Sequence, residues 1–383
     1  MYNPKVSQKT LKKKEPIKKL IYDTTLEIYM NNLVSNLNYF KSLLKPTTKI
    51  MAMVKAFSYG LGTYNVAKLL EENEVDCLGV ANTFEGIELR KAGIKLPILV
   101  MKPELDSFDL VVDYQLIPTI FSLHSLKCLT NTVDNTNPLS ISIKIDTGMH
   151  RLGFDKEEIE GLLAELKAHP FLKIESIFSH LAAAEDPNED EFTQYQIVAF
   201  KSIADMVVNH FDYPITKHIL NSNGMVRFNE HQMDMVRLGI GLYGVSTDDF
   251  TQQNLLPVSA LKSKITQIKT LKKGETIGYN RVGIAAKDMV IATIPVGYAD
   301  GLSRGLGNGK WSMLVNQQKA PIVGNVCMDM VMIDVTKIAC EVGDEAFIFS
   351  ADNSISAMAQ CIGTIPYEIL TSYSPRVKRV FKY

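Results

Sequence analysis

Residues 54–60 hold the side chain with the clearest chemical potential, because Lys55 lies between an apolar run and a glycine-rich turn. Lys55 follows the run at residues 50–54, so we expect it to emerge from the end of a buried strand. Burial removes water from an ammonium group and lowers its pKa, which makes the amine a usable nucleophile. Such a lysine can hold an aldehyde cofactor as a Schiff base. The alternative is an ordinary solvated lysine whose stem packs beside the strand.

Further basic side chains follow other apolar runs. Lys144 lies at the end of the run at residues 141–145, and Arg151 lies in the segment that follows this run. The planar guanidinium of Arg151 can bind a carboxylate or an electron-rich ring oxygen, or it can form a surface ion pair. His180 follows the next run, where a catalytic histidine and a hydrogen-bonded core histidine are both possible.

The last two runs of this part are followed by groups suited to a phosphate. Asn221 and Ser222 follow the first of them, and Arg237 leads into Gly239 after the second. Loops at these positions in barrels often bind phosphate through backbone N–H groups and a hydroxyl, and glycine lets the backbone approach the anion closely. Asn-Ser is also a common pair in turns and helix caps.

Eight short apolar runs must position these side chains. They lie at residues 50–54, 77–81, 97–101, 117–121, 141–145, 174–179, 218–220 and 235–238. Helix-like segments alternate with the runs, which predicts βαβ units and a parallel sheet. Eight strands can close into a (β/α)8 barrel of the TIM type, and an open doubly wound sheet is the alternative. No GxGxxG follows an early run, which disfavours the dinucleotide-binding form of the open sheet.

The chain divides into three predicted regions. Residues 1–21 are rich in lysine and predict a flexible basic tail, and residues 22–255 predict the barrel. Residues 256–383 have alternating apolar positions and glycine-bounded turns, which favour a mostly β domain.

Composition narrows the classes of function. Among 383 residues the formal net charge is -1, so no basic field is available for nucleic acid, and the apolar runs are too short to cross a membrane. The five cysteines contain no CxxC, which argues against a disulfide framework or a structural zinc site and favours a reducing cytoplasm. We therefore expect a cytoplasmic protein without a metal site.

Together the motifs resemble those of the alanine racemases. The resemblance is carried, in order, by Val-Lys-Ala-x-x-Tyr-Gly at 54–60, Asp-Thr-Gly-Met-x-Arg-Leu-Gly at 146–153, Arg-Leu-Gly-Ile at 237–240, Gly-Tyr-Ala-Asp-Gly at 297–301 and Cys-Met-Asp at 327–329. It extends from about residue 26 to 381. It implies a fold type III pyridoxal 5'-phosphate enzyme that racemises alanine and supplies D-alanine for peptidoglycan.

The resemblance implies a role for each matching residue. Lys55 corresponds to the lysine that binds the cofactor aldehyde and acts as one base, and Tyr279 to the second base, supplied by the partner subunit of a homodimer. Binding of the cofactor phosphate is implied for Tyr59, Asn221, Ser222, Gly239, Ile240 and Tyr373, and contact with the ring nitrogen for Arg237, with His180 behind it. Arg151 and the Met328 backbone correspond to groups that bind the substrate carboxylate, and Tyr298 to a residue that lines the substrate entrance. Lys144 corresponds to a lysine that can carry a carbamate.

Departures from the family pattern keep alternatives open. Phe57 and Leu61 replace a common asparagine and histidine, Gly224 replaces an alanine, and residues 280–281 replace a frequent glycine. We expect these changes to affect the edge of the pocket, so a serine or broad-specificity racemase is the main alternative. A fold type III decarboxylase and a pyridoxal phosphate carrier without turnover are the others. Both lack a role for Tyr279.

Overall fold

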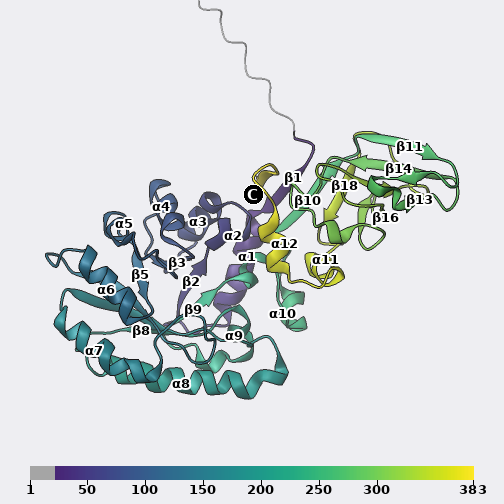
Figure 1. Cartoon of the computed structure of the whole chain (residues 1–383). Coiled ribbons are helices and arrows are strands. Elements are labelled where there is room, and N and C mark those ends of the chain that lie inside the picture. The colour runs from purple at the N-terminus through teal and green to yellow at the C-terminus, as the bar shows by residue number, and fades with distance from the viewer. Residues whose placement is uncertain (1–21) are drawn as a thin grey trace, which may run out of the picture.

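The computed structural model describes residues 22–383, so the basic tail expected at residues 1–21 lies outside the described part. The chain forms two parts (Figure 1): a barrel of strands surrounded by helices, and a mostly β part drawn from green to yellow.

The barrel contains eight parallel strands in the order β8-β7-β6-β5-β4-β3-β2-β9. They are β2 (Lys49–Met53), β3 (Cys77–Val80), β4 (Ile98–Val100), β5 (Ile117–Ile120), β6 (Leu139–Lys144), β7 (Leu172–Phe178), β8 (Thr216–His218) and β9 (Met235–Leu238). The ring closes between β8 and β9, where the Asp234 N–H donates to the Lys217 carbonyl at 3.2 Å and the Arg237 N–H donates to the Leu220 carbonyl at 3.0 Å. The predicted (β/α)8 barrel, followed by a mostly β domain, is confirmed.

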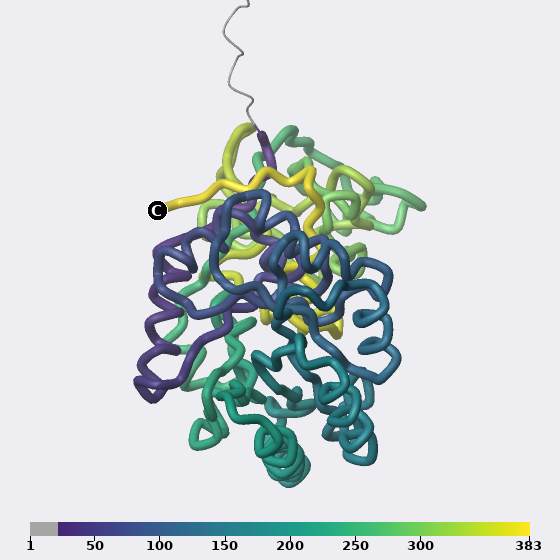
Figure 2. The backbone as a smooth tube through the Cα atoms, turned by 90° about the vertical axis from the view of Figure 1, so that its left-hand side faces the viewer, coloured from purple at the N-terminus to yellow at the C-terminus, as the bar shows by residue number. Residues whose placement is uncertain are grey.

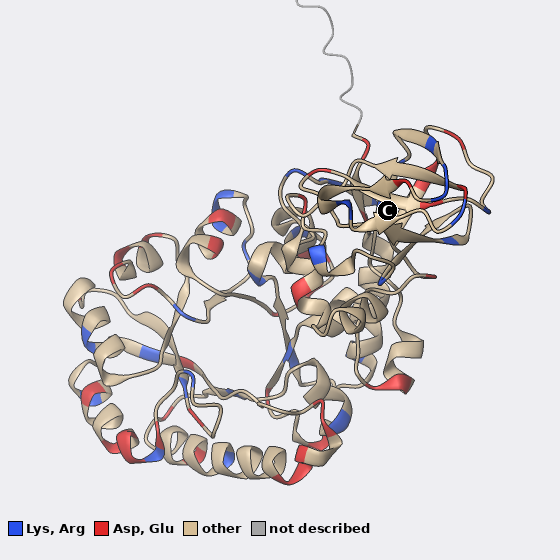
Figure 3. Cartoon of the chain, turned by 45° about the vertical axis from the view of Figure 1, so that its right-hand side comes forward, with Lys and Arg blue, Asp and Glu red and all other residues tan. Residues whose placement is uncertain are grey.

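Helices cover the outside of the strand ring, which explains why the strands are continuous aliphatic runs. The helices are α1 (Met30–Ser42), α3 (Thr63–Glu72), α4 (Thr83–Lys91), α5 (Phe108–Asp113), α6 (Leu123–Thr132), α7 (Ile159–Ala168), α8 (Asp190–Val208), α9 (Ser222–Arg227) and α10 (Asp249–Asn254). Acidic and basic residues are interspersed on these helices (Figure 3). Not even α8, the longest helix described, is long and apolar enough to cross a membrane.

The second part is built on a nine-stranded sheet in the order β11-β14-β17-β16-β15-β18-β10-β1-β19. Its strands are β1 (Thr25–Tyr29), β10 (Ser259–Lys264), β11 (Gln267–Leu271), β14 (Met289–Ile294), β15 (Ser312–Val315), β16 (Gln318–Val323), β17 (Val331–Asp334), β18 (Glu345–Phe349) and β19 (Lys378–Lys382). The hairpin β12 (Thr276–Ile277) and β13 (Gly283–Ile284) and the helices α11 (Ile355–Cys361) and α12 (Pro366–Ser372) complete it.

Strand β1 belongs to this second sheet, although it lies within the residues expected to form the barrel. It pairs antiparallel with β10 and parallel with β19. Leu26 and Ile28 are fully buried while their neighbours are partly exposed. This alternation fits a sheet with one covered face better than a barrel strand buried on both faces.

Both ends of the described chain therefore lie side by side in the second sheet, as Figure 2 shows where the yellow end of the chain runs beside the purple start. The two parts meet where the turn α2 (Lys55–Tyr59), which follows β2, contacts α12. A Cβ atom at Gly60 would lie only 2.1 Å from the Leu370 carbonyl oxygen. The first turn of the barrel is thus packed backbone to backbone against the second domain.

We expect Gly60→Ala to destabilise the protein more than Gly93→Ala. Both glycines have positive φ, 82° and 92°, but a Cβ at Gly93 would meet nothing within 4 Å. Both variants carry the cost of the left-handed conformation, and only Gly60→Ala adds a clash, which is expected to cost about 1–3 kcal/mol more. Urea unfolding followed by circular dichroism measures the difference. An equal loss of unfolding free energy in the two variants would mean that the contact between the domains rearranges to accommodate the methyl group.

Candidate active site

A cavity of about 150 Å³ opens at the carboxyl ends of the barrel strands, where barrel enzymes carry their chemistry. It is lined by Met53, Lys55, Tyr59, Met101, Lys144, Arg151, Phe178, His180, Asn221, Ser222, Arg237, Gly239, Ile240 and Tyr367. These residues include two lysines, two arginines and no carboxylate. The cavity therefore suits a ligand that carries negative charge.

Lys55 stands at the start of a turn with unusual handedness. Residues 56–59 have φ between 51° and 60°, and Gly60 follows at 82°. The Gly60 N–H donates to the Ala56 carbonyl at 2.9 Å, so the segment is a closed left-handed turn. This conformation costs roughly 1–2 kcal/mol for each residue other than glycine. Strain of this kind persists only where surrounding contacts hold it, and it is typical of functional sites.

The surroundings of Lys55 favour its neutral amine. Burial lowers its pKa, the charge of Arg151 lowers it next, and Arg237 adds to the effect, while the Glu85 carboxylate opposes it. A larger fraction of this lysine is consequently deprotonated near neutral pH than for a solvated lysine. The amine is thus suited to attack a carbonyl or to accept a proton.

Arg237 is held by two histidines and three carbonyls. Its Nη1 lies 2.8 Å from His218 Nδ1, and its Nη2 lies 3.0 Å from His180 Nδ1. Burial lowers the pKa of Arg237 to about 9, so the guanidinium stays charged near pH 7. Burial, followed by the charge of Arg237, lowers the pKa of both histidines well below its usual value. Both imidazoles are therefore neutral, and their Nδ1 atoms accept from the arginine.

Hydrogen-bond donors converge beside β9. The Ser222 hydroxyl oxygen accepts from the N–H groups of Gly239 at 2.9 Å and Gly241 at 3.3 Å. A Cβ at Gly239 would lie 2.8 Å from the Tyr59 hydroxyl oxygen, so glycine is what allows this close approach. Asn221 Oδ1 caps α9 by accepting from the Gly224 N–H at 2.9 Å. The arrangement can bind an anion through backbone and hydroxyl groups.

Four buried or half-buried tyrosines lie in or near this region. The ring of Tyr59 stacks on that of Tyr243, with ring centroids 4.5 Å apart. The ring centroid of Tyr367 lies 5.9 Å from that of Tyr59. Burial raises the pKa of Tyr367 to about 12 and raises that of Tyr59 as well, so both are neutral donors. Tyr373 is buried, and its hydroxyl has no hydrogen-bond partner within the described chain. A buried phenol usually has one.

Lys144 and Arg151 complete the cationic lining. Lys144 is only 7% exposed, and burial, then Arg151 and Arg237, lower its pKa to about 8. The charge of the Asp146 carboxylate opposes this lowering. The loop that carries Arg151 is held by Asp146 Oδ1, which accepts from the N–H groups of Gly148 and Met149 at 2.9 and 3.0 Å.

A second group of expected site residues lies on the β domain. Tyr279 and Met328 line an open groove of about 530 Å³ that is separate from the cavity. Their exposed fractions are 70% and 52%, and that of Tyr298 is 46%. The Tyr298 N–H donates to the Cys327 carbonyl at 3.0 Å, which ties it to the Met328 segment. In Figure 1 the hairpin ending in β13, which carries Tyr279, lies at the far end of this domain from the barrel.

Comparison with protein families identifies the kind of protein. The family model described as alanine racemase, N-terminal domain, matches residues 28–247, and the model of the alanine racemase C-terminal domain matches residues 258–381. The chain belongs to the alanine racemase family. This confirms the resemblance seen in the motifs.

Individual alanine racemases agree over nearly their full length. The enzyme of Sorangium cellulosum is 38% identical to this chain, and the match covers 94% of this chain and 99% of the relative. The enzyme of Halothermothrix orenii is 39% identical, and the match covers 95% of this chain and 98% of the relative. The solved alanine racemase of Clostridium difficile 630 has a TM-score of 0.88 at 34% identity, covering 95% of this chain and 97% of its own. That of Bacillus anthracis, with bound L-Ala-P, has a TM-score of 0.89 at 30% identity, covering 95% and 96%.

The structure brings most of the expected racemase residues together. Ten of them line the cavity: Lys55, Tyr59, Lys144, Arg151, His180, Asn221, Ser222, Arg237, Gly239 and Ile240. Tyr279, Met328 and Tyr298 do not join them within one chain, and Tyr373 is buried but does not line the cavity. Phe57 and Leu61, which we expected at the edge of the pocket, do not line the cavity. Phe57 is half-exposed elsewhere and Leu61 is buried in the core.

Sequence reasoning missed several residues of the site. Met53, Met101, Phe178 and Tyr367 also line the cavity, and His218 supports Arg237 from within β8. His218 stacks on Phe178 with ring centroids 5.0 Å apart. The one available signal was a histidine in an apolar run, which is also what a core histidine looks like.

We expect dissolved CO2 to form a carbamate on Lys144, as the family resemblance implies. With a pKa of about 8, about a tenth of this amine is neutral at pH 7, against roughly one part in 3,000 for an unperturbed lysine. At constant dissolved CO2, the carbamate fraction should rise between roughly pH 6 and pH 8 as the neutral fraction grows. Carbon-13 NMR in labelled bicarbonate measures it, with Lys144→Met as the control. A signal that survives Lys144→Met would contradict the prediction.

Proposed function

We propose that this protein interconverts L- and D-alanine with pyridoxal 5'-phosphate as its cofactor. The observation that carries the proposal is a lysine of lowered pKa in a cationic cavity that also contains a buried arginine and an anion-binding cradle. D-alanine made in this way would serve peptidoglycan synthesis, as the family resemblance implies. The cytoplasm is the compartment we propose, because all five cysteines are free thiols.

The cavity fits pyridoxal phosphate in three respects. Tyr373 is not among the lining residues, but its hydroxyl is buried with no hydrogen-bond partner among the described residues, and the glycine at 239 leaves room where a Cβ would approach Tyr59. The lining offers donors and cations but no carboxylate. We assign the phosphate to Tyr59, Ser222, Gly239, Ile240 and Tyr373, with Asn221 shaping the loop, and the aldehyde to the amine of Lys55.

The assigned residues divide the work of racemisation. When bound, pyridoxal phosphate supplies delocalisation of the electron pair left as the α-proton departs. Lys55 exchanges that proton on one face of the substrate carbon. Racemisation requires a second group on the opposite face, and we assign that role to Tyr279. Arg151 and the Met328 backbone N–H bind the substrate carboxylate, and Tyr298 lines the entrance.

Arg237 and the two histidines that contact it limit which reactions the cofactor would support. We assign Arg237 to the nitrogen of the cofactor ring; the guanidinium keeps its own proton near pH 7 and would therefore leave that nitrogen unprotonated. His180 and His218 accept from the same guanidinium and fix its plane. The residues thus favour return of the α-proton over competing reactions.

Exposure of the second base supports a dimer. Tyr279, Met328 and Met330 are 70%, 52% and 47% exposed around one groove. Apolar side chains gathered in this way mark an interaction surface. In a twofold dimer, each subunit would supply Tyr279, Met328 and Tyr298 to the cavity of its partner.

The competing readings differ in what they require of the chain. A carrier protein needs the barrel and lysine only, whereas the alanine racemase C-terminal model matches residues 258–381. A decarboxylase has no use for Tyr279. A serine or broad-specificity racemase remains the second candidate, and its motivation is weaker because Phe57 and Leu61 do not line the cavity.

Racemisation of L-alanine by the purified holoenzyme tests the proposal. We expect D-alanine to form, with kcat/KM for L-alanine about 10-fold or more above that for L-serine or L-lysine. An absorbance band near ~420 nm that borohydride removes would report the lysine-bound cofactor. Lys55→Ala is the control and should lose both signals. Equal turnover of serine would favour the second candidate, and no racemisation of any amino acid would refute the proposal.

A shared site predicts complementation between inactive variants. Lys55→Ala and Tyr279→Phe should each be inactive as homodimers. Random exchange of subunits should restore about a quarter of the sites, because half of the dimers are mixed and each mixed dimer has one intact site. Activity is measured after exchange has been verified by mass spectrometry of tagged subunits. If mixed dimers form and no activity returns, Tyr279 does not act across the interface.

A further inference from the structure

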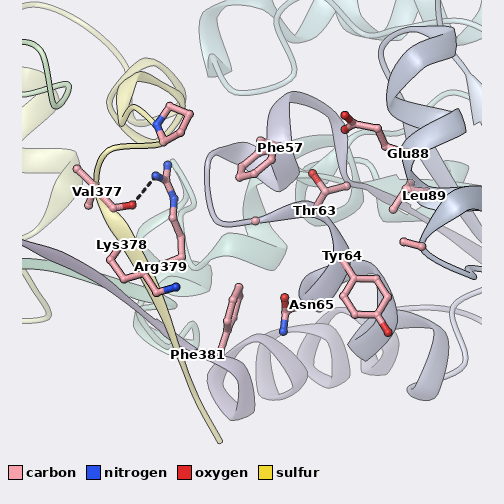
Figure 4. A pocket seen from close by; sticks show the side chains of 13 residues that line it. Phe57, Thr63, Tyr64, Asn65, Glu88, Leu89, Val377, Lys378, Arg379 and Phe381 are labelled. Carbon is pink, nitrogen blue, oxygen red and sulfur yellow. Dashed lines mark hydrogen bonds between the residues drawn. The ribbon is translucent and has the colours of Figure 1, made fainter. Parts of the chain in front are cut away.

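Arg379, on the last strand, uses all of its donors on backbone carbonyls. Nε and Nη2 donate to the Gly60 carbonyl at 3.1 and 2.9 Å. Nη2 also donates to the Tyr373 carbonyl at 2.6 Å, and Nη1 donates to the carbonyls of Ser374 and Val377. Figure 4 shows the side chain reaching between Val377 and Phe57. Its guanidinium also lies 5.9 Å from the Phe57 ring centroid.

The acceptors belong to two segments that the proposed function requires. Gly60 ends the left-handed turn that starts directly after Lys55. Tyr373, which directly follows α12 in the second domain, is a residue that we assign to the cofactor phosphate. One guanidinium therefore joins the turn next to the reactive amine to the backbone of the phosphate tyrosine. Charged donors make these bonds stronger than neutral ones.

The opposite end of the turn is held by a carboxylate. Glu85 Oε1 accepts from the Ala56 N–H at 2.8 Å, and Glu85 Oε2 accepts from the Ala81 N–H at 2.7 Å. Glu85 thus fixes the start of the turn to the barrel, while Arg379 fixes its end to the second domain. Among residues 22–383, Arg379 forms no ion pair with a carboxylate, so its charge is directed to these carbonyls.

We propose that Arg379 is a positioning residue that holds the strained turn and thereby keeps the Lys55 amine in place within the cavity. It touches neither the cavity nor a reacting atom. It lines a separate groove of about 430 Å³ behind the turn, together with Phe57 (Figure 4). The kinetic part of this inference rests on the proposed racemase function, and the structural part does not.

Hydrogen exchange of the full-length protein at saturating pyridoxal phosphate tests the structural part. Arg379→Gln keeps the approximate length of the stem and loses most of the donors. We expect the amides of Gly60 and Gly62, which close the turn, to exchange at least about 10-fold faster, with the barrel strands unchanged. Lys378→Gln, at the exposed neighbouring position on β19, is the control and should leave the turn protected. Unchanged exchange in Arg379→Gln overturns the inference.

Kinetics with alanine test the consequence for Lys55. A misplaced amine should lower kcat by about 10- to 100-fold in Arg379→Gln. KM should change by less than about 2-fold, because the loop of Arg151 is held independently by Asp146. Arg379→Lys keeps the charge but lacks the planar fork that spans both segments, so we expect little rescue. Full rescue by lysine, or a normal kcat in Arg379→Gln, would overturn the inference.

The two measurements separate the possible failures. If the wild-type protein does not racemise alanine, the proposed function fails while hydrogen exchange still decides the role of Arg379. If Arg379→Gln does not fold, the same exchange comparison is made with Arg379→Lys, where loss of protection confined to residues 56–62 supports the inference. An increase spread evenly over the barrel would indicate a general stabilising role and overturn it.

Discussion

The burial of positive charge at one end of the barrel is the constraint on which the rest of this site depends. Lys55, Lys144, Arg151 and Arg237 line one cavity without a carboxylate among them. Because each cation raises the cost of the next, the lysines hold their protons less tightly: burial and these charges lower the pKa of Lys55 and bring that of Lys144 to about 8. The guanidinium of Arg237 keeps its charge near neutral pH, since its pKa stays at about 9. The cavity is therefore nucleophilic and at the same time attractive to phosphate and carboxylate.

The same constraint explains the histidines around Arg237. A carboxylate partner would neutralise the arginine and reduce the field in the cavity. His180 and His218 instead accept as neutral imidazoles, which hold the guanidinium without cancelling its charge. Their depressed pKa values follow from burial and from the arginine itself. In the function that we propose, this arrangement would leave the nitrogen of the cofactor ring unprotonated.

The barrel and the β domain contribute to the site in different ways. The barrel carries the Lys55 amine and the polar groups around Ser222, and the left-handed turn after Lys55 is held from Glu85 on the barrel and Arg379 on the β domain. The β domain also presents Tyr279 and Met328 on an exposed surface. One domain thus stabilises the cavity of its own chain and, in the dimer we propose, completes the cavity of its partner.

The sequence by itself determined the eight barrel strands and most of the cavity. Continuous aliphatic runs alternating with helices are local patterns, and residues that follow such runs must meet at one end of a parallel barrel. Tertiary structure alone decided that β1 joins the second sheet, that His218 accepts from Arg237, and that Arg379 reaches Gly60 across 319 positions of sequence. It also decided that Phe57 and Leu61 avoid the cavity. These outcomes depend on contacts between distant segments, and such contacts leave no periodic trace in the chain.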